Sequence, residues 1–156
     1  MRFLLTSLCL YFWCLSFAQA DEKITLEQIN HFLDSHSTAI MQKDDSKLST
    51  LFSTDYQQYD TKTPTQHLNQ NDIVKIYKNN FMVAKLIISK INLLDAKISE
   101  DAQHATLNTH IFSRYLIEFQ GKQNILNQQE DWLSEVGLVH GQLVYLSTQK
   151  TLNVSP

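Results

Sequence analysis

Three side chains suited to binding or proton transfer recur along one expected strand, over residues 105–119. His110, Arg114 and Glu118 are spaced four residues apart. Because side chains alternate along a strand, all three lie on one face, opposite the apolar face. This polar stripe either binds an anion or a peptide, or forms a solvated or dimer-facing sheet surface with cross-strand charge pairs.

A second group of candidate residues is aromatic. Tyr77 and Phe81 lie on an expected helix, while Tyr115, Trp132 and Tyr145 lie on expected strands. Aromatic side chains bury a large area, and Tyr and Trp also offer a polar atom to a ligand. These residues therefore line a binding pocket or simply form the core.

The histidines do not suggest a metal site. His31 and His36 are five positions apart on one helix, which points His31 to solvent and His36 to the edge of the core. His67, His104 and His140 have no partner at ligand spacing. The sequence also lacks a glycine-rich phosphate loop, a nucleophile elbow and a helical His-Glu-x-x-His motif. We therefore expect neither a metal nor a cofactor.

Three helices precede the expected sheet. Residues 25–28 have the form of a capping box, and apolar residues then recur at helical spacing over about 18 residues, ending near Lys43. A short second helix is expected over 47–52. Asn71 or Asp72 then caps a third helix that runs through Phe81.

The expected strands follow a change of periodicity. A brief strand over 56–60 leads into a polar loop over 61–71, and strand 88–98 slips in phase between Leu93 and Leu94, which indicates a β-bulge. The remaining strands are expected over 105–119, 127–136 and 143–150, with turns at Gln120-Gly121-Lys122, at Gly137 and at His140-Gly141. This order predicts an α+β fold in which N-terminal helices pack on one face of a strongly curved antiparallel sheet.

The first twenty residues have the pattern of a targeting signal. A basic start, an apolar run from Phe3 to Phe17 and the small residues around Gln19 are typical of a secretory signal cleaved after Ala20. The run of about 16 residues is short for a membrane anchor. Cleavage leaves 156 − 20 = 136 residues without cysteine, and no further run spans a membrane, which suggests the bacterial periplasm.

The composition bounds the function. A net charge of −3 over 156 residues excludes a typical nucleic-acid binder. The length supports one domain over 21–152, followed by a frayed tail at 153–156.

Two stretches carry a family resemblance. Residues 47–56 are similar to the short helix and first strand of the SnoaL-like, or nuclear transport factor two-like, superfamily. Residues 129–133 and 140–145 resemble its Trp-bearing strand and last hairpin, although Leu143 stands where a second Trp is usual. The resemblance implies a cone-like sheet wrapped around helices, with an apolar cavity and dimerisation through the sheet face. A cystatin-like α+β fold is the main alternative.

Members of this superfamily serve as isomerases, dehydratases, ligand-binding proteins or packed modules, so the fold does not choose a function. Ser147 and Gln149 stand where many relatives carry His. The remaining candidate acid or base is Asp60, which lies beside Tyr59 at the end of a strand. The alternative interpretation of Asp60 is an exposed carboxylate that begins the following loop. If the polar stripe faces the cone, His110 becomes the general base and Arg114 an anion clamp.

Three functions remain open. The first is a secreted domain that binds a small apolar ligand without turning it over, and the second is an isomerase or dehydratase that uses Asp60 or His110. The third is an interaction module, such as a homodimer through the sheet face or a subunit of an envelope assembly. The aromatic pocket without a convincing acid–base pair favours the first.

Overall fold

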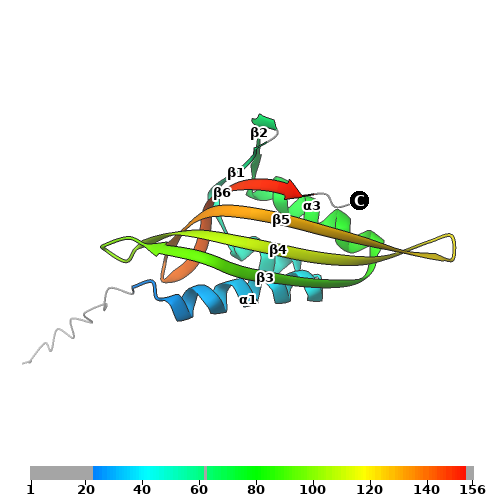
Figure 1. Cartoon of the computed structure of the whole chain (residues 1–156), viewed down its shortest axis with the longest axis horizontal. Helices are drawn as coiled ribbons and strands as arrows, with labels where there is room; N and C mark the ends of the chain where they lie inside the picture. Colours follow the sequence, from blue (N-terminus) through cyan, green and yellow to red (C-terminus); the bar gives the residue numbers. More distant parts are fainter. Residues whose placement is uncertain (1–22, 62, 154–156) are drawn as a thin grey trace, which may run out of the picture.

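The computed structural model describes residues 23–61 and 63–153, so the expected signal over 1–20 and most of the tail lie outside the described residues. Three helices and six strands follow one another along these residues (Figure 1). The helices are α1 (Leu26–Gln42), α2 (Asp45–Thr50) and α3 (Gln70–Val83). The strands are β1 (Phe52–Asp60), β2 (Thr63–Asn69), β3 (Ala84–Ile98), β4 (His104–Phe119), β5 (Lys122–Val139) and β6 (Gln142–Asn153).

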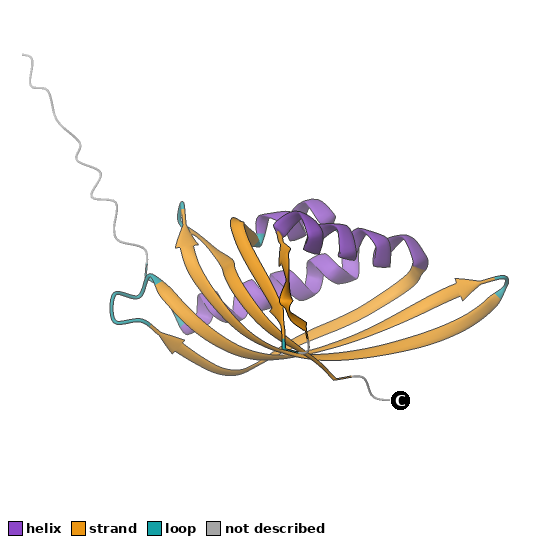
Figure 2. Cartoon of the chain, turned by 90° about the horizontal axis from the view of Figure 1, so that it is seen from above, coloured by secondary structure: helices purple, strands orange, loops and turns teal. Residues whose placement is uncertain are grey.

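The six strands form one sheet in the order β2-β1-β6-β5-β4-β3. The sheet is strongly curved, and the helices lie in its hollow (Figure 2). This arrangement confirms the predicted α+β architecture. We call the helix-covered side of the sheet its inner face and the opposite side its outer face.

Local signals account for the ends of α1 and α3. Thr25 accepts a hydrogen bond from the Gln28 backbone, and the Gln28 side chain accepts one from the Thr25 backbone, as the capping box requires. Lys43 ends α1 in the left-handed conformation. Asn69 and Asp72 form a second capping box at α3, so the prediction that Asn71 or Asp72 caps this helix is wrong.

Helix α1 runs alongside β3, the last strand of the sheet (Figure 1). The Ile91 backbone N–H in β3 donates a hydrogen bond to the buried Ser37 hydroxyl of α1 at 3.2 Å. The Lys43 ammonium, at the end of α1, donates to the Ala84 carbonyl at the start of β3. The helix therefore satisfies backbone groups that an edge strand would otherwise leave without partners.

A β-bulge and two tight turns lie in the sheet at positions that the sequence predicts. The β3–β4 register shifts between Leu93 and Asp95, which confirms the predicted bulge. The β4–β5 and β5–β6 hairpins turn at Gln120-Gly121 and His140-Gly141, and all four residues have positive φ angles. Two consecutive positive φ angles are the geometry of a type I′ hairpin, in which glycine fits easily.

Three expectations about the sheet differ from the structure. Part of the expected loop over 61–71 is strand β2, because its backbone pairs with β1. Gly137 lies inside β5 rather than in a turn, at a position where the Leu146 side chain and the His104 ring leave little room for a β-carbon. The sheet is mixed and not wholly antiparallel, since β1 runs parallel to β6.

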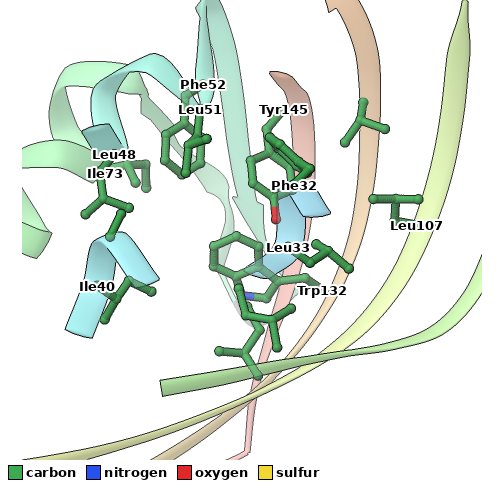
Figure 3. Packing of buried hydrophobic residues seen from close by; sticks show 14 of the residues in the cluster. Phe32, Leu33, Ile40, Leu48, Leu51, Phe52, Ile73, Leu107, Trp132 and Tyr145 are labelled. Atoms are coloured by element: carbon green, nitrogen blue, oxygen red, sulfur yellow. The ribbon is translucent and has the colours of Figure 1, made fainter. Parts of the chain in front are cut away.

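The core lies between α1 and the inner face of the sheet. Ile29, Phe32, Leu33, His36 and Ile40 of α1 are all buried, as the apolar spacing predicts. His36, however, is fully buried and not at the edge of the core. Figure 3 shows Phe32, Phe52, Trp132 and Tyr145 gathered in this core. No helix within the described residues is both long and apolar enough to span a membrane.

Candidate functional site

A cavity of about 160 Å³ lies between α3 and the inner face of the sheet. At roughly 30 Å³ per water, the space equals that of about five water molecules. Its apolar wall is formed by Leu68, Ile73, Ile76, Ile111, Tyr115 and Trp132. Its polar lining is formed by Gln58, Asp60, Tyr77, Asn80, Ser113, Gln128, Glu130 and Lys150.

The polar side of the cavity is built around a buried ion pair. Glu130 and Trp132 share one face of β5, and register places Lys150 of β6 opposite Trp132. The Lys150 ammonium lies 2.5 Å from Glu130 Oε1, and the Trp132 indole donates to Oε2 at 2.7 Å. The Gln128 amide also donates to Oε1. The Glu130 side chain is only 7% exposed, and that of Lys150 is 20% exposed.

This arrangement suits binding better than proton abstraction. Both oxygens of Glu130 already accept hydrogen bonds, and the carboxylate charge is balanced by Lys150. A general base needs an acceptor atom within reach of the substrate proton. Glu130 therefore serves to fix Lys150, Gln128 and the Trp132 ring in the cavity wall.

Behind the cavity, His36 joins two tyrosines in a hydrogen-bonded chain. Its Nδ1 atom lies 3.1 Å from the Tyr145 hydroxyl, and its Nε2 atom lies 3.3 Å from the Tyr77 hydroxyl. Burial lowers the pKa of His36 to about 3 and raises the pKa of both tyrosines. All three side chains are consequently neutral at pH 7.

A second short chain approaches the cavity from β1. The Tyr56 hydroxyl donates to Gln58 Oε1 at 3.3 Å, and both side chains are buried. Burial raises the pKa of Tyr56, so its hydroxyl keeps its proton. Because the Gln58 carbonyl oxygen faces Tyr56, this contact fixes the orientation of the Gln58 amide in the cavity wall.

The structure brings several of the predicted site residues to this cavity. Asp60, Tyr77, Tyr115 and Trp132 all line it. Tyr145 lies behind it and reaches it through His36. Four elements (β1, α3, β4 and β5) thus supply predicted residues to one space.

Two other predicted aromatic residues do not line this cavity. Phe81 packs beside Tyr77, with ring centres 6.0 Å apart. Tyr59 packs against the His67 ring, with centres 4.6 Å apart, while its neighbours Gln58 and Asp60 line the cavity.

The polar stripe of β4 lies away from the cavity, on the outer face of the sheet. Its neighbours Ile111, Ser113 and Tyr115 face the cavity. On the stripe itself, the His110 ring is 2.7 Å from Asp131, the Arg114 guanidinium donates to Asn127, and Glu118 pairs with Lys85. The structure thus separates this stripe from Asp60, and His110 has the cross-strand charge partner of a sheet surface.

Glu130 and Lys150 are cavity residues that were not predicted from the sequence. Strand alternation offered a signal for Glu130, because an inward Trp132 implies that the residue two positions earlier also faces inward. Lys150 required the pairing of β5 with β6 in the correct register. His36 was recognised as part of an apolar helix face, but its tyrosine partners lie on α3 and β6, distant in sequence.

A second hollow, of about 450 Å³, lies between α1, α2 and the β5–β6 hairpin. Most of its polar lining side chains, among them Glu27, Gln28, His31 and Lys47, are exposed, and they lack the buried contacts of the first cavity. Within residues 23–61 and 63–153, no three His, Cys, Asp or Glu side chains are grouped as a metal site would require.

No protein-family model matches this chain, and no curated protein sequence does. Solved structures do. A putative scytalone dehydratase from Novosphingobium aromaticivorans has a TM-score of 0.67 at 13% identity, over 82% of this chain and 83% of that one. A ketosteroid isomerase-like protein from Erwinia carotovora has a TM-score of 0.62 at 12% identity, over 84% of this chain and 97% of that one.

A hexachlorocyclohexane dehydrochlorinase, LinA type 2, has a TM-score of 0.64 at 8% identity, covering 82% of this chain and 84% of that one. These neighbours confirm the SnoaL-like, nuclear transport factor two-like fold that the sequence resembles. At such low identity the likeness concerns the fold alone.

Proposed function

We propose that this protein binds a small, largely apolar molecule in the cavity beneath α3, without turning it over. The observation that carries the proposal is the combination, in one cavity, of an apolar wall with the Glu130–Lys150 ion pair, in which both carboxylate oxygens accept hydrogen bonds. Apolar walls supply affinity, and a few fixed polar groups supply orientation.

The size of the cavity limits the ligand. About 160 Å³ is smaller than the roughly 300 Å³ at the lower end of ordinary ligand pockets. A single six-membered ring with one substituent is the scale that we propose. The neighbours whose names describe a dehydratase, a dehydrochlorinase and an isomerase-like protein show that this fold accommodates small-molecule sites.

Toluene is a suitable probe for the test. We expect a saturable shift of the Trp132 indole N–H signal in an NMR spectrum, because this indole lines the cavity. Replacing Ile76, which lines the cavity from α3, by Phe should fill the space and abolish the shift. Met82→Phe, on the exposed side of the same helix, is the matched control. If toluene shifts the indole signal equally in both variants, the cavity is not the site.

Asp60 supports a second candidate, an isomerase or dehydratase. Its carboxylate lines the same cavity, and cross-strand register places it opposite Lys150. The expected signature is enzyme-catalysed exchange of α-hydrogens for deuterium when cyclohexanone is incubated with the protein in heavy water. Asp60→Asn should abolish this exchange and leave toluene binding intact. Absence of exchange in the unmodified protein would exclude this acid–base role for the probe.

We also propose that the chain is secreted to the periplasm after cleavage behind Ala20. The support is the pattern of its first twenty residues. The intact mass of protein recovered from the periplasm of expressing bacteria should lack those residues. Recovery of the full-length mass from the cytoplasm alone would contradict this proposal.

Association through the outer sheet face is a further part of the proposed function. Cross-strand pairing places Leu86, Leu116 and Ile125 in one apolar row on this face, and Ile125 is 63% exposed. Arg114 and Glu118 place both charge signs beside it, so a second copy turned about a two-fold axis can pair them. Light scattering should show a dimer that Ile125→Lys dissociates, and a monomeric parent protein would refute it.

A further inference from the structure

The direction of donation along the hydrogen-bonded chain Tyr145–His36–Tyr77 determines whether the Tyr77 hydroxyl can donate a hydrogen bond into the cavity. Tyr145 and His36 are both completely buried, whereas Tyr77 is half-buried and lines the cavity. The imidazole ring is surrounded by the rings of Phe52, Tyr77, Trp132 and Tyr145. The chain thus runs from a dry end at Tyr145 to the ligand space at Tyr77.

His36 holds a single ring proton in this environment. Burial among aromatic rings lowers its pKa to about 3, so the neutral imidazole is the form present at pH 7. A neutral imidazole has one nitrogen that donates and one that accepts. Only two hydrogen-bonding arrangements of the chain are therefore consistent with the distances.

The buried Tyr145 hydroxyl decides between these two hydrogen-bonding arrangements. Within the described residues, His36 Nδ1 is the hydrogen-bond partner of the Tyr145 hydroxyl. If Nδ1 carried the proton, the Tyr145 O–H would become a buried donor without an acceptor, which is strongly disfavoured. If Tyr145 donates to Nδ1 instead, the proton lies on Nε2 and is donated to the Tyr77 oxygen. The Tyr77 O–H is then available to the cavity.

We propose that His36 is a positioning residue, protonated on Nε2, which turns the Tyr77 hydroxyl into a hydrogen-bond donor for a ligand oxygen. The inference rests on the proposed binding function and names its ligand class. The ligand is a small neutral molecule with an apolar ring and one acceptor oxygen, as in a ketone, aldehyde or ester.

The other polar groups of the cavity favour the same ligand class. Gln58 directs its carbonyl oxygen to Tyr56, so its amide N–H groups are the part left for other partners. Within the described residues, the one ammonium that lines the cavity is that of Lys150, and it already pairs with Glu130. A carboxylate ligand would have to compete with Glu130 for this cation, which favours a neutral acceptor.

The first test is spectroscopic and needs no substitution. In the protein labelled with ¹⁵N at histidine, we expect His36 to show a protonated Nε2 and an unprotonated Nδ1, with no change between pH 8 and pH 5. A protonated Nδ1 would overturn the proposal, because Tyr77 would then donate to His36 and not to the cavity. This measurement does not depend on any ligand.

The second test compares cyclohexanone with toluene as probes. Tyr77→Phe should weaken cyclohexanone binding by about threefold to tenfold, the usual contribution of one hydrogen bond, and leave toluene binding unchanged. Tyr59→Phe, whose ring packs against His67 away from the cavity, is the matched control and should change neither.

The outcomes separate the two proposals. Equal weakening of both probes in Tyr77→Phe would assign Tyr77 a packing role and overturn the donor role. Binding of toluene without cyclohexanone would overturn the ligand class while leaving the binding function in place. Failure of the unmodified protein to bind either probe would overturn the binding function and, with it, the ligand class.

Discussion

The buried ion pair gives the sharpest prediction about stability. Lys150→Met removes the cation that lies 2.5 Å from Glu130, whose side chain is 7% exposed. Removing one partner of a buried pair leaves an uncompensated charge, at a cost of about 3–5 kcal/mol. Because Trp132 and Gln128 still donate to the carboxylate, we expect the lower end, about 3 kcal/mol.

An exposed ion pair in the same sheet supplies the matched control. Lys85 lies 2.6 Å from Glu118, with side chains 60% and 40% exposed. Surface pairs of this kind contribute about 0–1 kcal/mol, so Lys85→Met should cost less than about 1 kcal/mol. The two pairs have nearly equal lengths, and burial is the main difference between them.

The measurement is urea unfolding at pH 7, followed by circular dichroism, with the free energy compared at a common slope. A double variant, Glu130→Gln with Lys150→Met, removes both charges and should recover at least half of the loss. The reasoning is refuted if Lys150→Met costs no more than Lys85→Met. It is also refuted if the double variant is as unstable as the single one.

Three further predictions concern individual residues. The pKa of His36 is about 3 in the folded protein, against an ordinary value of 6.5. The contribution of the neutral imidazole to the free energy of unfolding is therefore fully present above pH 6.5 and is lost as the pH falls towards 3. Between pH 7 and pH 5 we expect a loss of about 2 kcal/mol. His36→Phe should remove this part of the pH dependence of urea unfolding, and the exposed control His31→Phe should retain it. Asn69→Ala deletes the cap of α3, and calorimetry should show a loss of about 1 kcal/mol. Gly141 has a φ of 77°, so Gly141→Ala should cost about 1 kcal/mol, and an unchanged melting temperature would contradict its strain.

Local features of the fold were predictable because their causes lie within a few residues. The Gln120-Gly121 and His140-Gly141 turns follow from the freedom of glycine at positive φ. The slip between Leu93 and Leu94 marks a bulge because alternation must resume on the same face. The apolar spacing of α1 predicts its buried face for the same local reason.

Non-local pairing explains what was missed. Strand β2 is polar and contains Pro64, so its strand conformation arises from pairing with β1 and not from its own residues. The β1–β6 contact joins segments from opposite ends of the domain in parallel. The Glu130–Lys150 pair depends on β5–β6 register. Asp60 was recognised as a candidate carboxylate, and its presence in the cavity wall follows from the same β1–β6 pairing.

The contact of α1 with β3 has a consequence for self-assembly. An uncovered strand of 15 residues would be a long template for adding foreign β-strands. The Ser37 hydroxyl and the Lys43 ammonium occupy backbone positions at which such a strand would attach. The opposite margin of the sheet is the seven-residue β2. Detachment of α1 would therefore expose a 15-residue edge to fibril-like growth even while the sheet itself stays intact.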